Sequence, residues 1–97
     1  MQAVAVSLVL VVYNTSAWLK ACLTSIFSQT FPDIELVVVE DCSTDGTREL
    51  LLQLLHGKKN VQCILNQKNV GGATAANIGI AKATGEYVFL MDSDDVL

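Results

Sequence analysis

The sequence has little positive charge: ten acidic residues outnumber six lysines and arginines, and the formal net charge is -4. This balance argues against electrostatic binding to nucleic-acid backbones or anionic membrane surfaces. Charged residues of either sign make up only 16% of the chain, against 52% hydrophobic residues, which is typical of a folded globular protein. A chain of 97 residues is expected to form one domain over residues 1–97.

Cysteine is also scarce, and no hydrophobic run is long. Cys22, Cys42 and Cys63 are odd in number, form no C-x-x-C pair and have no histidine beside them. This pattern indicates thiols in a reducing compartment and supports neither a disulfide framework, nor a zinc site, nor thiol catalysis. The apolar run from Ala3 to Val12 is too short to cross a bilayer and lacks the basic flank of a signal peptide. We therefore expect a cytoplasmic protein without an integral membrane segment.

What the chain does contain is an alternation of strand and helix patterns. Apolar runs of strand length cover residues 4–13, 34–39, 61–65 and 87–91. Between them, apolar residues recur at helical spacing, and the last such stretch, 73–83, consists largely of alanine and glycine. Strands that alternate with helices predict right-handed crossovers and a mainly parallel sheet. The predicted fold class is therefore α/β, a Rossmann-like three-layer α/β/α arrangement with four strands and three helices.

Polar or acidic residues follow three of the four predicted strands. Tyr13 and Asn14 follow the first, residues 41–45 the second, and residues 92–95 the fourth. In a parallel sheet, ligands bind outside the carboxyl ends of the strands, where the strand order reverses. One pocket could therefore collect all three groups, and this convergence predicts a ligand site.

The acidic residues after the fourth strand suit a hard cation. Mg²⁺ and Mn²⁺ take oxygen ligands and are usually held by one or two carboxylates together with substrate phosphates. Asp92 and Asp94, two positions apart at a strand end, are candidate ligands. The alternative is a solvated acidic turn that ends the strand.

Two further groups have competing interpretations. A carboxylate at Asp41 could accept hydrogen bonds from a base or from ribose hydroxyls, or it could be solvated while residues 43–45 begin a helix. Gly71 could bring a backbone N–H group near a phosphate, or it could belong to an ordinary turn, because the chain has no G-x-G-x-x-G or Walker motif. Lys68 and Arg48, the basic residues nearest these loops, are expected to face solvent.

Five segments carry a family resemblance, and they are Ser7–Asn14, Ser25–Phe31, Glu35–Thr47, Asn69–Gly72 with Asn77–Gly79, and Gly85–Asp95. Their order and spacing over essentially the whole chain resemble the N-terminal, nucleotide-sugar-binding half of a family 2 inverting glycosyltransferase of the GT-A fold. The resemblance implies that the chain binds a nucleotide-sugar, with UDP or a UDP-sugar as the commonest donor and thymidine or guanosine donors left open. The resemblance does not indicate which acceptor molecule receives the sugar or which glycosidic linkage is formed.

The resemblance also implies roles for individual residues. The backbone near Val11 and Tyr13 would flank the base, and Asp41 would hydrogen-bond the uracil or its equivalent. Asp92 would lie near the ribose or the donor sugar. Asp94, which follows Ser93 and is the second acid of an Asp-x-Asp motif, would bind the Mn²⁺ or Mg²⁺ that bridges the diphosphate.

The chain departs from the family pattern at several points. Glu40 replaces the first residue of the usual Asp-Asp pair, and Ala76 stands where many members carry an arginine. The general base of an inverting transferase comes from a later segment in this family, so no catalytic residue is assigned and the acceptor-binding half is expected to be absent. The alternative function is a truncated UDP-binding module without transferase activity.

The fourth strand is also a predicted sheet edge with an uncovered apolar face. Such an edge offers unpaired backbone groups and apolar side chains to another chain. The sequence therefore predicts a homo-oligomer.

Overall fold

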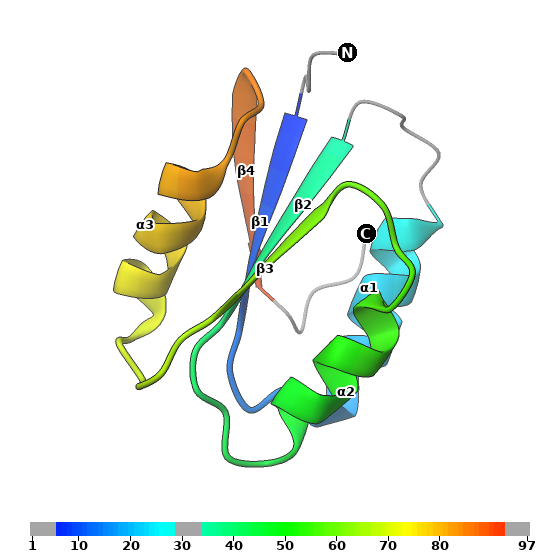
Figure 1. The fold of residues 1–97 in the computed structure, drawn as a ribbon, viewed down its shortest axis with the longest axis vertical. Coiled ribbons are helices and arrows are strands. Elements are labelled where there is room, and N and C mark those ends of the chain that lie inside the picture. Colours follow the sequence, from blue (N-terminus) through cyan, green and yellow to red (C-terminus); the bar gives the residue numbers. More distant parts are fainter. Residues whose placement is uncertain (1–5, 29–33, 93–97) are drawn as a thin grey trace.

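The computed structural model describes residues 6–28 and 34–92, and it has the predicted alternation of four strands and three helices (Figure 1). The elements in order are β1 (Val6–Val12), α1 (Ser16–Phe27), β2 (Ile34–Glu40), α2 (Thr47–Leu55), β3 (Val61–Leu65), α3 (Gly72–Lys82) and β4 (Tyr87–Asp92). The first strand ends one residue earlier than predicted. Asn14, two residues later, has a φ of 50°, a left-handed conformation that turns the chain out of the sheet.

All four strands are parallel, in the order β3-β2-β1-β4. Helix α3 covers one face of the sheet, and α1 and α2 lie together on the other, so the predicted three-layer α/β/α fold is confirmed (Figure 1). The chain leaves β1 toward β2 and β3 on one side and returns to β4 on the other. The strand order therefore reverses between β1 and β4, where ligands bind in sheets of this kind.

The main apolar core lies between the sheet and helices α1 and α2. It contains Leu10 and Val38 from the central strands and Leu23 and Leu51 from the helices, all of them buried. Their burial follows from the alternation of side chains along each strand, which sends every second residue to this face. The core thereby holds α2 against the sheet, with the first turn of the helix near the carboxyl ends of the strands (Figure 1).

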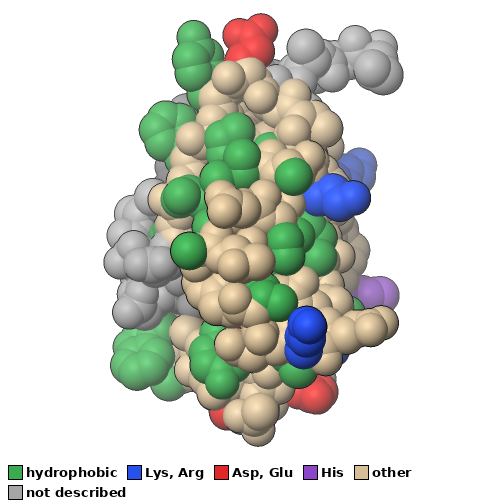
Figure 2. Space-filling view, turned by 90° about the vertical axis from the view of Figure 1, so that its left-hand side faces the viewer, with side chains coloured by type: hydrophobic (Ala, Val, Ile, Leu, Met, Phe, Trp, Pro, Cys, Tyr) green, Lys and Arg blue, Asp and Glu red, His purple; other side chains and the backbone are tan. Residues whose placement is uncertain are grey.

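On the opposite face, α3 approaches the sheet closely, as its small residues predict. A Cβ atom added to Gly79 would collide with Val9 and would lie 3.0 Å from Cγ2 of Val39. Figure 2 views the molecule from the side of α3, where hydrophobic side chains are scattered over the face and the few lysine or arginine side chains lie toward its right-hand side. The small residues thus hold α3, and the loop that leads into it, close to β1 and β2.

A buried polar cluster lies at the amino ends of the strands, away from the predicted site. The carboxylate of Glu35 accepts hydrogen bonds from Ser7 Oγ and Gln62 Nε2, both at 2.6 Å, and from the N–H and hydroxyl groups of Thr84, both at 3.0 Å. Burial raises the pKa of Glu35, but these hydrogen bonds outweigh it and leave the pKa below its ordinary value. Gly85 N–H donates to Ser7 Oγ at 2.9 Å, so the cluster ties the start of β4 to β1 and β2.

β4 forms one edge of the sheet, as predicted. Within the described part of the chain, Met91 is buried in the core, but Tyr87 is 63% exposed, and Phe89 and Leu90 are each 58% exposed. Among residues 6–28 and 34–92, none of the helices has the length and apolar character needed to cross a membrane.

Candidate functional site

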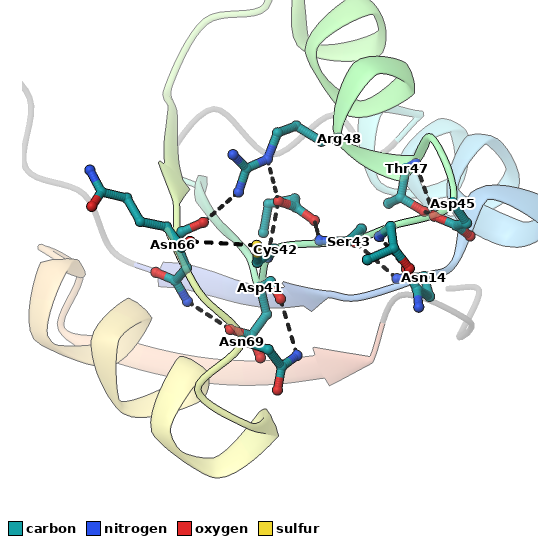
Figure 3. A network of polar contacts seen from close by, with 12 residues as sticks. Asn14, Asp41, Cys42, Ser43, Asp45, Thr47, Arg48, Asn66 and Asn69 are labelled. Atoms are coloured by element: carbon teal, nitrogen blue, oxygen red, sulfur yellow. Dashed lines mark hydrogen bonds and ion pairs between the residues drawn. The ribbon is translucent and has the colours of Figure 1, made fainter.

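The carboxyl ends of β1, β2 and β3 bring three loops together at the lower end of the sheet in Figure 1. Residues 13–15 lead from β1 to α1, residues 41–46 from β2 to α2, and residues 66–71 from β3 to α3. Because the strands are parallel and adjacent, these loops share one edge. Figure 3 shows that their polar side chains are joined by hydrogen bonds.

Glu40, the last residue of β2, holds the loop between β2 and α2. Its carboxylate is fully buried and accepts hydrogen bonds from the N–H groups of Cys42 and Ser43, at 3.2 and 2.7 Å, and from Arg48 Nε at 2.6 Å. Burial raises the pKa of Glu40, but the hydrogen bonds from Ser43 and the charge and hydrogen bond of Arg48 outweigh it and lower the pKa. Glu40 is therefore a buried, paired anion.

Asp41 holds the loop between β3 and α3. Its Oδ1 atom accepts hydrogen bonds from Asn66 Nδ2 at 3.0 Å and from the Val70 N–H group at 2.9 Å, and its Oδ2 atom accepts one from Gly71 N–H at 3.0 Å. Asn69 Nδ2 donates to its backbone oxygen at 3.1 Å. Asp41 is only 2% exposed, so the alternative in which this carboxylate is solvated is wrong.

The number of hydrogen bonds to Asp41 limits what it can offer a ligand. An ionised carboxylate has about four acceptor positions. Three of them are occupied by donors from residues 66–71. The fourth position has no donor among the described residues.

The backbone angle of Gly71 and the hydrogen bond of its N–H group both bear on its predicted role. Its φ is 91°, a region that side chains with a Cβ atom rarely adopt, and this turn leads directly into α3. Its N–H group donates to Asp41. A phosphate at this loop would therefore need a donor other than that N–H group.

Hydrogen bonds also join the loops that follow β1 and β2. The N–H group of Asn14 donates to Ser43 Oγ at 2.9 Å. Asp45 accepts hydrogen bonds from Ser16 Oγ at 3.1 Å and from the N–H group of Thr47, the first residue of α2, at 3.0 Å. These hydrogen bonds hold the start of α1 next to the start of α2, beside Tyr13, which is 43% exposed.

The sequence led us to expect that Arg48 faces solvent. The structure shows instead that its side chain is partly buried and paired. Its side chain is 30% exposed and forms an ion pair with Glu40, and its Nη2 atom donates to the backbone oxygen of Asn66 at 2.5 Å. In Figure 3, Arg48 approaches the strand ends from α2, whereas Asn69 lies on the side of α3. Lys68, by contrast, is exposed as expected.

Sequence reasoning missed the roles of Arg48, Asn66 and Asn69. The available signal was Glu40, because a carboxylate at the end of a buried strand requires a partner. Arg48 is the nearest cation along the chain. The asparagines gave no comparable signal, since their contacts join segments more than twenty residues apart.

The predicted metal residues lie at the limit of the described chain. The backbone of Asp92 ends β4 and pairs in register with Val11, at the point where the strand order reverses. The side chain of Asp92, together with Ser93 and Asp94, lies outside the described residues. Within the described ranges no three histidine, cysteine or acidic residues are grouped so as to hold a metal ion.

Comparison with known proteins identifies relatives over nearly the whole chain. The model of the family described as "Glycosyl transferase family 2" matches residues 7–97. The glycosyltransferase GlyG of Streptococcus pneumoniae is 40% identical over 93 residues, which are 95% of this chain and 31% of GlyG.

Solved structures show the same arrangement. The structure of Staphylococcus aureus TarS 1-349 in complex with UDP-GlcNAc matches with a TM-score of 0.86 and 34% identity, over 95% of this chain and 27% of that one. The mannosyltransferase PcManGT of Pyrobaculum calidifontis, in complex with GDP-Man and Mn²⁺, matches with a TM-score of 0.88 and 28% identity, over 98% of this chain and 29% of that one. The chain thus spans less than a third of the length of each of these relatives.

Proposed function

The chain belongs to glycosyl transferase family 2, and from this premise we propose that it binds a nucleotide-sugar donor at the carboxyl edge of its sheet. The observation that carries the proposal is the buried carboxylate of Asp41. It organises residues 66–71, and one of its acceptor positions has no donor among the described residues. The similarity to proteins whose structures contain UDP-GlcNAc or GDP-Man supports a donor of this class.

We assign the base of the nucleotide to the side of the site near β1 and β2. The backbone at Val11 and Tyr13 flanks the base, and the remaining acceptor position of Asp41 receives a base N–H group. Gly71 lets the loop before α3 pass close to the nucleotide. We favour a UDP-sugar over a GDP-sugar because one acceptor position matches the single N–H group of uracil, whereas the edge of guanine presents two kinds of N–H donor.

We assign the diphosphate and the donor sugar to the side near β4. Asp92 ends β4 at the reversal point, Ser93 and Asp94 come next in the sequence, and Asp92 and Asp94 supply the carboxylate oxygens that Mn²⁺ and Mg²⁺ prefer. A bound cation of this kind stabilises the negative charge on a departing nucleoside diphosphate. The reaction we propose is transfer of the sugar to an acceptor hydroxyl with inversion.

A binding module without transferase activity is the second candidate. It is favoured by one observation: the two buried carboxylates at this edge, those of Glu40 and Asp41, are already engaged within the chain. Glu40 is paired with Arg48, and Asp41 holds its own loop. Both candidates predict metal-dependent binding of UDP, and only the transferase predicts turnover.

Calorimetric titration of the intact chain with UDP, with and without Mn²⁺, tests the donor site. We expect binding that strengthens when Mn²⁺ is present, and weaker binding of GDP. Heat absent under every condition would reject the donor site. Release of UDP from UDP-sugars in the presence of candidate acceptors then separates the transferase from the binding module.

Two further predictions concern the whole protein. We propose that two copies associate through the uncovered edge of β4, where Tyr87, Phe89 and Leu90 are exposed.

A cytoplasmic location remains a prediction from the cysteine pattern, and no disulfide joins the three cysteines, all of which the structure describes.

A further inference from the structure

We propose that Arg48 is a positioning residue for nucleotide binding, which fixes the Asp41 carboxylate through Asn66. This inference rests on the proposed donor site and adds residues from α2 and from the end of β3 to it. Arg48 does not touch the nucleotide in this arrangement. It acts through the loop that follows β3.

The first step is the double contact of the Arg48 guanidinium group. Its Nε atom donates to Glu40 Oε2 at 2.6 Å, and its Nη2 atom donates to the backbone oxygen of Asn66 at 2.5 Å. Glu40 is itself immobilised, because it is fully buried and accepts two backbone N–H groups from residues 42 and 43. Arg48 therefore holds Asn66 against a fixed anchor in β2.

The second step leads from Asn66 to Asp41. The N–H group of Asn66 donates to the backbone oxygen of Glu40 at 2.9 Å, so both backbone polar groups of Asn66 are held. With the backbone fixed, its side-chain Nδ2 atom donates to Asp41 Oδ1 at 3.0 Å. This chain of contacts (Figure 3) orients the Asp41 carboxylate together with the N–H groups of Val70 and Gly71.

Arginine is required by the geometry of these contacts. Its planar group presents several donors in a fixed fork, whereas the lysine ammonium group is a single point charge on a flexible stem. Lysine at this position would keep the charge opposite Glu40 but could not hold Glu40 and Asn66 with the same fixed geometry. Arg48→Lys therefore separates positioning from simple charge neutralisation.

The loss of affinity caused by replacing Arg48 should be confined to contacts with the base of the nucleotide. Asp41 and residues 66–71 follow β2 and β3, whereas the proposed metal residues are the last residue of β4 and one that comes after it in the sequence, and β4 lies on the far side of β1. A misplaced Asp41 should therefore weaken binding of UMP and of UDP by the same factor. The increase in UDP affinity that Mn²⁺ produces should stay the same.

The experiment is titration calorimetry of the intact wild-type chain and Arg48→Lys with UMP and UDP, each with and without Mn²⁺. We expect Arg48→Lys to raise both dissociation constants about tenfold, which corresponds to one lost charge-assisted hydrogen bond. Asn66→Ala, which leaves the ion pair intact, should raise them to a similar extent. The double variant should be little worse than either single variant, because both break the same chain of contacts.

Two control variants separate positioning from loss of stability. Glu49→Gln changes the exposed neighbour of Arg48 on α2, and Ser7→Ala removes a buried hydrogen bond of the Glu35 cluster at the opposite end of the strands. Ser7→Ala should lower the urea midpoint of unfolding, and neither control should change the dissociation constant of UDP.

Three results would overturn the inference. Wild-type affinity in both Arg48→Lys and Asn66→Ala would show that Asp41 is positioned without them. An equal loss of affinity in Ser7→Ala would show that stability alone governs binding. Failure of the wild-type chain itself to bind UMP and UDP would instead reject the donor site, and this inference with it.

Discussion

Glu40 and Asp41 are neighbours in the sequence, but their carboxylates hold different loops on opposite sides of the sheet. Glu40 pairs with Arg48 of α2, whereas Asp41 accepts the N–H groups of Val70 and Gly71 before α3. The alternation of side chains along an extended strand produces this division. Two consecutive acids thereby organise two walls of the proposed donor site.

Asp41→Asn should weaken both folding and nucleotide binding. The amide replaces one carboxylate oxygen with an NH₂ group, which cannot accept a hydrogen bond and would oppose at least one of the present donors. We expect the free energy of unfolding to fall by about 1 to 3 kcal/mol and the affinity for UDP to fall with it. Urea denaturation and calorimetry measure the two effects, and a variant with wild-type stability and affinity would contradict the role of Asp41.

The two glycines of α3 that have ordinary backbone angles should respond differently to alanine. In Gly79→Ala the new Cβ atom collides with Val9, so we expect a loss of about 1 to 3 kcal/mol in the free energy of unfolding. Gly72→Ala is the matched control, because a Cβ atom there meets nothing within 4 Å. Thermal or urea unfolding checks both variants. Equal stability of the two would show that α3 does not pack as closely as described.

The unfolding free energy should fall in mild acid. The pKa values of Glu35 and Glu40 are lowered in the folded state from their ordinary value of 4.5. The unfolded chain therefore binds protons more readily, so the stabilisation is fully present above pH 4.5 and is lost as the pH falls toward the lowered values.

Glu35→Gln provides the test of this pH dependence. Replacing Glu35 with an uncharged residue should flatten the pH profile measured by urea unfolding, and Glu86→Gln, at an exposed position, should leave it unchanged. A variant profile as steep as that of the wild-type chain would contradict the assignment to Glu35.

Asp94→Asn should abolish the metal dependence of UDP binding. An amide is a neutral and weaker ligand than a carboxylate for Mn²⁺ and Mg²⁺. We expect the affinity for UDP to become independent of Mn²⁺, while UMP binding, which involves no diphosphate, changes little. Titration calorimetry measures both, with Glu86→Gln as the acidic control. Retention of the full Mn²⁺ effect would exclude Asp94 as a metal ligand.

Phe89→Glu should disperse copies that associate through β4. Phe89 is 58% exposed, so a carboxylate there remains hydrated in the single chain, but it would be buried, with its charge unpaired, in an association through this edge. Light scattering at micromolar concentration should report a dimer or larger species for the wild-type chain and a lower mass for the variant. A monomeric mass for the wild-type chain would reject self-association through this edge.

Sequence reasoning was most accurate where the pattern is local. The apolar runs of β1 and β2 and the small residues of α3 indicated their elements directly, and the parallel order followed from their alternation. The same reasoning left Asp41 with two interpretations and placed Arg48 in solvent. Their burial and hydrogen bonds depend on residues 66–71, which follow a different strand. The roles of Asp92 and Asp94 remain predictions.

The sequence by itself determined the order of strands and helices and the edge of the sheet at which polar residues gather. These features depend on hydrophobic periodicity, which is a property of consecutive residues. The tertiary structure alone decided that Glu40 pairs with Arg48, and that Asp41 has three of its acceptor positions filled by residues 66–71. Pairings of this kind arise only when packing brings distant segments within hydrogen-bonding distance and removes water from between them.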